Sequence, residues 1–145
     1  MKKINLKNFA SSIISFSFVY VTIILLNSCA RKMSFGNSEI MPTARGAVKI
    51  KTDRNTNNAI DVKVFHLAPA DKLTPPRKVY VVWMVTANDE TKNLGQLNSS
   101  SSMLSKTLKA SLETTSPFKP VSFFITAEDE SSTEYPGSTI VLNTK

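Results

Sequence analysis

Cys29 is the residue whose type and surroundings most clearly predict a chemical reaction. It is the only cysteine in the 145-residue chain, so no intramolecular disulfide can form. Leu26 lies three positions before it and Ser28 immediately before it. A cysteine thiolate is a strong nucleophile, and small neighbours let an enzyme approach the backbone. Cys29 is therefore the candidate site of a covalent modification.

The residues before Cys29 have the composition of a secretory signal. Three lysines occur within the first seven residues, an apolar run covers 13–26, and no acidic residue precedes Glu39. A positive head followed by an apolar stretch and small residues is typical of a cleaved export signal. An uncleaved membrane helix over 8–28 is the alternative, because its length approaches the roughly 20 residues that a bilayer requires. We favour a signal peptide over 1–28, since Cys29 lies where such a signal should end.

The tetrapeptide Leu26-Asn27-Ser28-Cys29 resembles the lipobox of bacterial lipoproteins, although Asn27 departs from the more usual Ser, Ala or Thr. The resemblance implies a diacylglyceryl group on the Cys29 sulfur and an acyl chain such as palmitate on its new amino group. Each buried methylene adds about 0.8 kcal/mol of membrane affinity, so two or three chains anchor a protein stably. The lipobox resemblance also implies a membrane-anchored lipoprotein of the cell envelope. The sequence Ala30-Arg31-Lys32 contains no acidic run, which favours a periplasm-facing anchor.

Other residues with chemical potential are isolated along the chain. His66 is the only histidine, and no second histidine, cysteine or nucleophile pattern accompanies it, so neither a triad nor a zinc site is predicted. Acidic side chains gather in two loops that could bind calcium if they met at one end of the fold. Their spacing matches no known calcium loop, and we interpret them as solvated turns. These residues are Asp89, Glu90, Glu128, Asp129, Glu130 and Glu134. We predict no catalytic residue, no metal and no cofactor.

Two further features have a functional and a structural interpretation. Tyr80, Trp83 and Phe124 could form an exposed aromatic platform for a sugar or peptide, but aromatic residues on a central strand are more often core. The run 73–76 (LTPP) could be a polyproline II ligand. A rigid connection between strands is the simpler interpretation of that run.

Formal charge does not indicate a nucleic-acid ligand. The chain carries +7, and removal of the three signal lysines leaves 15 basic and 11 acidic residues, a charge of +4. Several basic residues follow the anchor and could lie against anionic headgroups. We interpret them as an ordinary solvated basic face. They are Arg31, Lys32, Arg45, Lys49, Lys51 and Arg54.

Hydrophobic patterning predicts an all-β domain. The segment 30–43 is polar and lacks periodicity, so together with Cys29 it is interpreted as a flexible tether over 29–43. The domain is placed at 44–145, where short apolar stretches alternate with turn clusters. A strand at 79–87 is apolar on both faces and should be central. The other predicted strands are 46–51, 60–64, 94–97, 121–128 and 140–142, with a polar loop at 98–102. The segment 104–112 fits both helix and strand spacing, and we interpret it as a strand because Thr and Ser dominate its other face.

About seven strands in roughly 100 residues is the usual size of an immunoglobulin-like antiparallel β-sandwich. Each fully buried large apolar side chain contributes about 1.5–3 kcal/mol, so the predicted core needs no disulfide. The predicted core residues are Val48, Ile50, Ile60, Val62, Val64, Leu67, Trp83, Val85, Leu108, Leu112, Phe123, Ile125, Ile140 and Leu142.

The order of motifs resembles a known module. YVVWMV begins at Tyr80, LGQL at Leu94 and FITAE at Phe124, and a Pro-Gly pair at 136–137 precedes IVL. Over 78–142 this order resembles the C-terminal, extracytoplasmic domain of anti-sigma-K factors. The resemblance implies the fold and an extracytoplasmic location. Only the predicted signal precedes Cys29, and there is no His/Cys zinc cluster, so sigma sequestration is not implied and no binding residue is carried over.

These observations predict a non-enzymatic binding or interaction module anchored at a membrane surface. Its expected partners, besides the membrane itself, are an envelope protein or a glycan. An extracytoplasmic sensor or regulatory domain related to anti-sigma factors is the alternative. An enzyme is the least favoured class, because no nucleophile with a base and no paired carboxylates occur at a plausible spacing.

Overall fold

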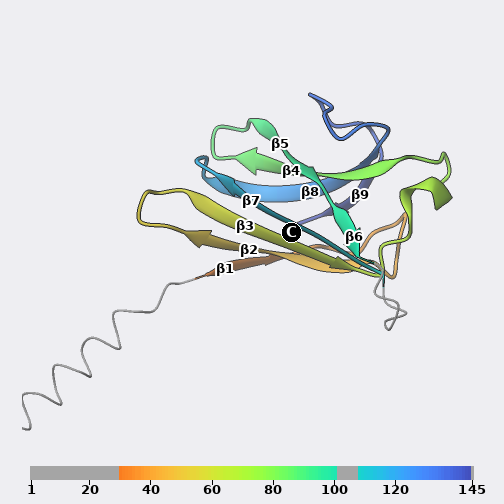
Figure 1. Ribbon diagram of the computed structural model, residues 1–145, viewed down its shortest axis with the longest axis horizontal. Helices are drawn as coiled ribbons and strands as arrows, with labels where there is room; N and C mark the ends of the chain where they lie inside the picture. Colours follow the sequence, from red (N-terminus) through yellow and green to blue (C-terminus); the bar gives the residue numbers. More distant parts are fainter. Residues whose placement is uncertain (1–29, 101–107, 145) are drawn as a thin grey trace, which may run out of the picture.

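The computed structural model describes residues 30–100 and 108–144, and over these the chain forms a sandwich of two antiparallel β-sheets (Figure 1). One sheet has five strands in the order β1-β2-β3-β7-β6, and the other has four in the order β5-β4-β8-β9. The strands are β1 (Arg31–Ser34), β2 (Arg45–Thr52), β3 (Asn58–Phe65), β4 (Val79–Thr86), β5 (Thr91–Gln96), β6 (Asn98–Ser100), β7 (Lys109–Ser116), β8 (Pro120–Glu128) and β9 (Ile140–Asn143). The predicted all-β sandwich is confirmed.

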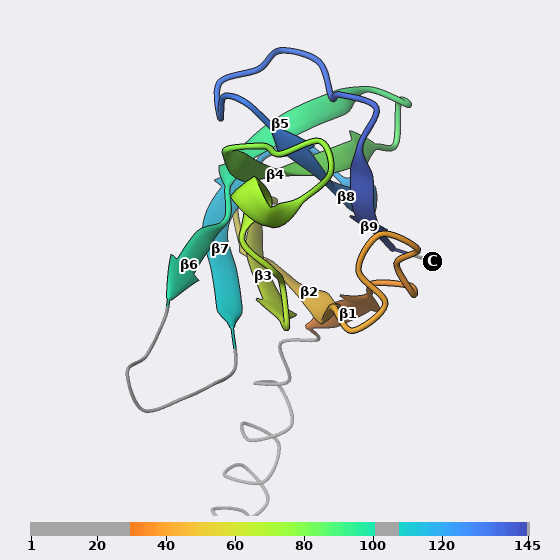
Figure 2. The ribbon, with the colours of Figure 1, turned by 90° about the vertical axis from the view of Figure 1, so that its right-hand side faces the viewer.

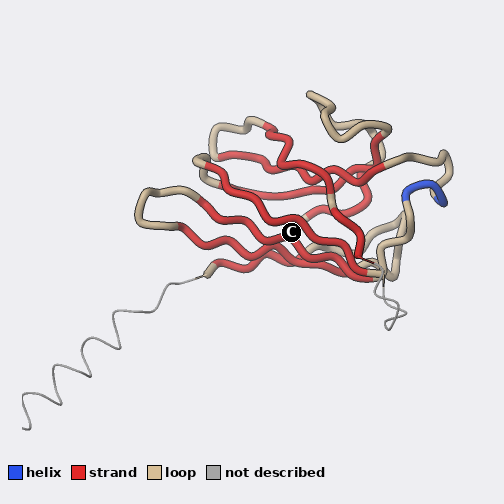
Figure 3. The backbone as a smooth tube through the Cα atoms, in the orientation of Figure 1, coloured by secondary structure: helices blue, strands red, loops and turns tan. Residues whose placement is uncertain are grey.

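Strands dominate the described chain, and Figure 3 shows that its helical part is a single short turn. That turn is the 3-10 helix η1 (Ala70–Lys72), in the connection between β3 and β4. Within the described residues, no helix is long and apolar enough to cross a membrane.

Alternation along β3 sets the inner face of the five-stranded sheet. Ile60, Val62 and Val64 are buried, and the residues between them are exposed or half-buried. Val62 pairs with Val48 of β2 on one side and with Leu112 of β7 on the other. Because side chains alternate between the two faces of a strand, this register directs one apolar row toward the second sheet, which lies across from it in Figure 2.

The central strand β4 is buried on both faces, as its continuous apolar sequence predicts. Val82 and Met84 belong to the core between the sheets, and each is fully buried. Val81 and Trp83 are also fully buried but do not belong to that core cluster. They lie on the outer face of the four-stranded sheet, to which hydrogen bonds of Ser131, Thr133 and Gly137 fasten the segment 129–139.

The predicted core is largely confirmed, with two errors. Leu108 is 42% exposed, because it precedes β7 and borders a surface cleft. Ile140 is 51% exposed, because it pairs with Thr126 at a register shift and lies on the outer face of its sheet. Val85 and Leu112 are half-buried. The buried members of the predicted set are Val48, Ile50, Ile60, Val62, Val64, Leu67, Trp83, Phe123, Ile125 and Leu142.

The predicted flexible tether over 29–43 is wrong for the residues that the structure describes. Arg31–Ser34 form β1, and Met33 pairs with Val48 of β2. Phe35 and Met41 are buried in the core. The edge of β2 offers backbone hydrogen bonds to this segment, and Met33 and Phe35 add apolar contacts. The folded domain therefore begins at β1 rather than at residue 44.

Two strand boundaries also differ from the prediction. The polar segment 98–102 contains β6, which pairs with the end of β7. The strand predicted at 104–112 is β7 at Lys109–Ser116, and 101–107 lie outside the described residues. The polar residues 113–116 (ETTS) extend this strand beyond its last leucine, Leu112.

Candidate functional site

The predicted lipidation residue, Cys29, lies outside the described residues, but the structure shows where the chain next to it enters the fold. Arg31 pairs with Ile50, and its Nη1 donates to the Pro120 carbonyl oxygen at 3.5 Å. Asn58 Nδ2 donates to the Phe118 carbonyl oxygen at 3.0 Å. The first strand therefore starts at the end of the sandwich that carries the β2–β3 and β7–β8 loops, on the left in Figure 1.

His66 occupies a turn position rather than a reactive site. It is exposed at the end of β3 and has a φ of 58°, a left-handed backbone conformation that few non-glycine residues adopt. Its backbone N–H donates to the Leu108 carbonyl oxygen at 2.8 Å. This contact fixes the end of β3 against the residue that precedes β7, and gives the position a structural role.

The two acidic loops do not meet. Glu128 lies opposite Val79, the first residue of β4, whereas Asp89 and Glu90 follow the last residue of the same strand. The condition for a shared calcium site is therefore not met. Each loop instead forms an ion pair with a basic side chain: Arg77 Nη1 lies 2.8 Å from Asp129 Oδ2, and a lysine pairs with Glu90. No group of three potential ligand side chains occurs among the described residues.

A buried polar chain connects β4, β8 and the segment 129–139. Trp83 Nε1 donates to Thr126 Oγ1 at 2.8 Å, and that hydroxyl donates in turn to Glu128 Oε1. The same carboxylate oxygen accepts the Gly137 N–H at 2.8 Å. Trp83 and Thr126 are fully buried, and Glu128 is 8% exposed. Each donor satisfies a buried polar atom that would otherwise be unpaired, so the chain of bonds fastens the segment over the outer face of the sheet.

Further contacts hold the same segment in place. Asn93 Nδ2 donates to the carbonyl oxygens of Ser131 and Thr133 at 3.0 and 2.9 Å. A Cβ at Gly137 would lie only 2.8 Å from Glu128 Oε2, so the absence of a side chain permits the close approach. Sequence reasoning missed this cluster. The available signal was the alternation of Thr126 and Glu128 on one strand face, beside a tryptophan on the neighbouring strand.

The aromatic residues do not form an exposed platform. Tyr80 belongs to the core between the sheets, whereas Trp83 lies on the opposite face of β4. Trp83 and Phe124 stack with ring centroids 6.2 Å apart and an interplanar angle of 12°. Because Trp83 has no exposed surface, this pair contributes to packing, as the core interpretation expects.

A cleft of about 580 Å³ lies at the end of the sandwich remote from Arg31. It lies between the β3–β4 connection and β7, and its floor includes Leu97 and Ala110. The Tyr80 hydroxyl borders it and donates to the Ala68 carbonyl oxygen at 2.8 Å. Burial raises the pKa of Tyr80 to about 12, with a smaller contribution from the Asp71 charge. A phenol that stays protonated at neutral pH can donate a hydrogen bond, as Tyr80 does here to Ala68.

The LTPP run is part of a packed connection. It follows η1, and the Arg77 N–H donates to the Ala70 carbonyl oxygen at 3.0 Å, which closes the connection into a loop. Leu73 packs partly buried against the core. This arrangement supports the interpretation of the run as a rigid connection.

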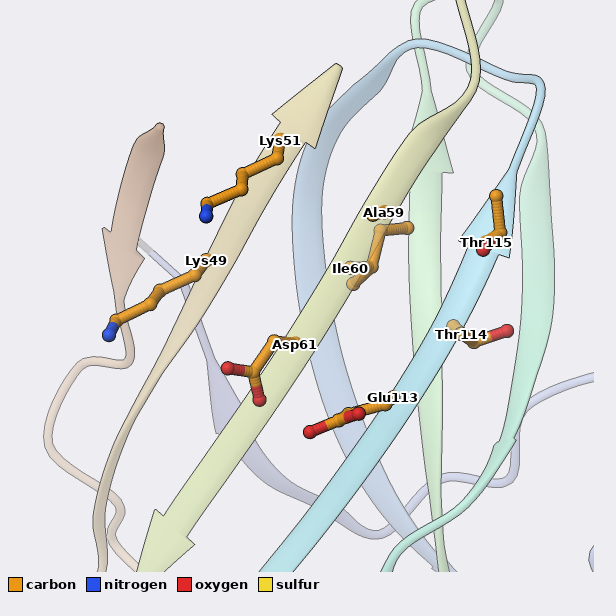
Figure 4. A pocket seen from close by; sticks show the side chains of 8 residues that line it. All are labelled: Lys49, Lys51, Ala59, Ile60, Asp61, Glu113, Thr114 and Thr115. Atoms are coloured by element: carbon orange, nitrogen blue, oxygen red, sulfur yellow. The ribbon is translucent and has the colours of Figure 1, made fainter. Parts of the chain in front are cut away.

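The outer face of the five-stranded sheet is open and charged. Figure 4 shows Lys49 and Lys51 extending from β2, and Asp61 and Glu113 projecting from β3 and β7. Lys63 Nζ donates to Asp61 Oδ2 at 2.9 Å, and this bond raises the pKa of Lys63 above its usual 10.5. The second oxygen, Asp61 Oδ1, is buried without a hydrogen-bond partner among the described residues.

Comparison of the chain with models of protein families, with curated proteins and with solved structures finds no match to any of them.

Proposed function

We propose that this chain is a bacterial lipoprotein, anchored through acylated Cys29, whose sandwich domain is a non-enzymatic, extracytoplasmic binding or interaction module. The observation that carries the proposal is the position of Cys29 in a Leu-Asn-Ser-Cys tetrapeptide directly after the apolar run 13–26. The cell envelope, with a periplasm-facing anchor, is the proposed location.

The position of β1 supports anchoring close to the bilayer. Consecutive Cα atoms are about 3.8 Å apart, so Cys29 lies within roughly 8 Å of the first residue of β1 along the chain. A lipid on Cys29 would thus hold the domain at the headgroups.

Three features favour binding over catalysis. His66 serves a turn, the Glu128 carboxylate accepts hydrogen bonds from Thr126 and Gly137, and the described lining of the cleft beside Tyr80 lacks a nucleophile paired with a base. General acid–base or nucleophilic catalysis needs such a pair within hydrogen-bond reach. The available surfaces, by contrast, offer charge, hydrogen-bonding groups and an apolar cleft, which are what a protein or glycan partner requires.

We further propose that the sandwich is immunoglobulin-like. Immunoglobulin domains place strands A, B, E and D in one sheet and C, F and G in the other. With β2 as strand A, the order β2-β3-β7-β6 corresponds to A-B-E-D, and β4-β8-β9 corresponds to C-F-G. The strand β5 then occupies the place of an added C′ strand, and β1 is an extra edge strand.

The experiment that tests the lipoprotein proposal is mass spectrometry of the membrane fraction after expression with the complete leader. We expect an N-terminal peptide that starts at Cys29 and carries two or three acyl chains. Cys29→Ser should retain its leader and lose the acyl mass, whereas Ser28→Ala, which keeps a small residue before the cysteine, should be processed normally. Recovery of unmodified, uncleaved wild-type protein from the membrane would refute the proposal.

A sensor or regulatory module is the second candidate, and one observation favours it. The motifs that resemble anti-sigma-K factors fall on β4, β5, β8 and β9, which together make up the four-stranded sheet. Chemical crosslinking of the anchored protein followed by affinity purification separates the candidates. A membrane-spanning component of a sigma system favours regulation, and an envelope protein or a glycan favours the interaction module.

A further inference from the structure

The outward side chains of the five-stranded sheet form a surface that we call the basic face. Register pairs Lys32 of β1 with Lys49 of β2, Lys49 with Asp61 of β3, and Asp61 with Glu113 of β7. Side chains opposite one another in antiparallel strands project from the same face. The charged members of the basic face are Lys32, Arg45, Lys49, Lys51, Lys63, Lys109, Asp61 and Glu113.

Charge is distributed unequally between this face and the remainder of the domain. The basic face holds six basic side chains and two carboxylates, a formal charge of +4. The remaining described residues hold seven basic and nine acidic side chains, a charge of −2. Four of the acidic residues lie between Glu128 and Glu134, at the segment that covers the opposite layer. The described domain is therefore strongly dipolar, with its positive side on the five-stranded sheet.

The positive charge is concentrated on the strands nearest the anchor. Lys32, Arg45, Lys49 and Lys51 all lie on β1 and β2, and no carboxylate projects from those two strands. Both carboxylates of the face lie on β3 and β7, and Asp61 is already bound by Lys63. Within the described residues, no ion pair engages the four basic groups of β1 and β2.

The shape of the basic face suits small anionic groups. Ala47 and Ala59 occupy outward positions between charged residues, and each lines a hollow that Lys49 and Asp61 also line. Long lysine side chains can lay their methylene stems along apolar surface while the ammonium groups stay solvated. The ammonium groups can then reach phosphates that lie across the hollows.

We propose that the basic face rests on anionic lipid headgroups of the membrane that holds the anchor, an inference that depends on the proposed acylation of Cys29. β1 is the edge strand of this sheet and begins two residues after Cys29. Each basic side chain near an anionic surface strengthens association roughly fivefold, and the attraction fades within about 10 Å. The short connection keeps the face within that range, so the domain lies flat with its acidic layer away from the lipid.

The test uses the mature acylated protein added to vesicles of phosphatidylcholine alone, or of phosphatidylcholine mixed equally with phosphatidylglycerol. Lysine amines are acetylated and the extent is measured by mass spectrometry. Lys63 reports on the basic face, and Lys72, which is exposed in η1, reports on a distant surface. We expect anionic vesicles to slow labelling of Lys63 by at least about threefold relative to neutral vesicles, with little change at Lys72, and high salt to remove the difference.

A pair of variants with equal charge provides the control. The triple variant Lys32→Gln, Lys49→Gln, Lys51→Gln should lose the protection of Lys63. A second triple variant changes three exposed lysines off the face to glutamine and should retain it; these are Lys72, Lys78 and Lys119.

Three results would contradict the anchor or the lipid-facing orientation. If the protein does not float with either vesicle, the anchor itself is refuted. If it floats with both but Lys63 labels equally in each, the anchor stands and the lipid-facing orientation is overturned. If Lys63 is protected in native membranes but not in anionic vesicles, a protein or glycan covers the face, and the lipid assignment is likewise overturned.

Discussion

Replacing Thr126 with valine should destabilise the domain strongly, although the two side chains have nearly the same shape. Valine keeps the shape of threonine but removes the hydroxyl that accepts the Trp83 Nε1–H and donates to Glu128. An unsatisfied buried donor costs about 1–3 kcal/mol, and a lost hydrogen bond to a charged group costs a similar amount. The Gly137 N–H still satisfies the carboxylate in part. We therefore expect a total loss of about 2–4 kcal/mol.

The assay is a thermal melt of the acylated protein in detergent, followed through the intrinsic fluorescence of Trp83, the only tryptophan of the chain. At about 4 °C per kcal/mol for a domain of this size, Tm should fall by about 10 °C. Thr115→Val is the matched control, because Thr115 is exposed on β7. If Thr126→Val melts within about 2 °C of this control, which is the range of ordinary surface substitutions, the polar chain does not stabilise the fold and our reasoning is wrong.

Three more predictions concern separate parts of the domain. Gly46→Ala should cost about 1–3 kcal/mol of unfolding free energy in a urea titration, because its Cβ would lie 2.6 Å from the Lys63 carbonyl oxygen, whereas Ala47→Ser on the open face should be nearly neutral. Asn93→Ala should speed hydrogen exchange of the amides in 130–138 while lowering the free energy of unfolding by no more than about 1.5 kcal/mol. Unchanged exchange would contradict the role of Asn93 in holding this segment in place. Tyr80 should ionise near pH 12 in an absorbance titration of the folded protein. Because its folded pKa exceeds the unfolded value of 10.0, the stability of the domain is retained below pH 10 and falls as pH rises toward 12. Ionisation of Tyr80 near pH 10 in the folded protein would contradict its burial.

Periodicity predicted the parts of the fold whose burial is itself periodic. The alternation of Ile60, Val62 and Val64 located β3, and the unbroken apolar run of β4 indicated a strand covered on both faces. In each case a side chain's neighbours along the sequence determine which face it occupies. Such patterns specify strand type and core membership before any tertiary contact is considered.

Tertiary contacts determined the remainder. β1 has only Met33 to point inward, and β6 has none of the apolar residues that mark a strand, so both form because an adjacent strand edge offers hydrogen bonds. Trp83 was correctly predicted as buried, but the segment fastened to its face of the sheet comes from residues 129–139, which are polar and resemble a solvated loop in sequence. The Glu128 cluster escaped prediction for the same reason, since an isolated acidic residue gives no indication that a glycine nine positions later will cover it.

The presence of β1 where a flexible tether was predicted changes how the proposed lipoprotein would meet a partner. A flexible tether of about 15 residues would let the domain range roughly 20 Å from its anchor. With β1 starting two residues after Cys29, a lipid on Cys29 would confine the domain to the bilayer surface, and its orientation would then matter. If the basic face meets lipid, the four-stranded layer faces outward, together with the segment 129–139, whose Tyr135 is 76% exposed. A protein or glycan partner should therefore contact that layer, so substitutions at Tyr135 should weaken capture of the partner while leaving membrane flotation unchanged.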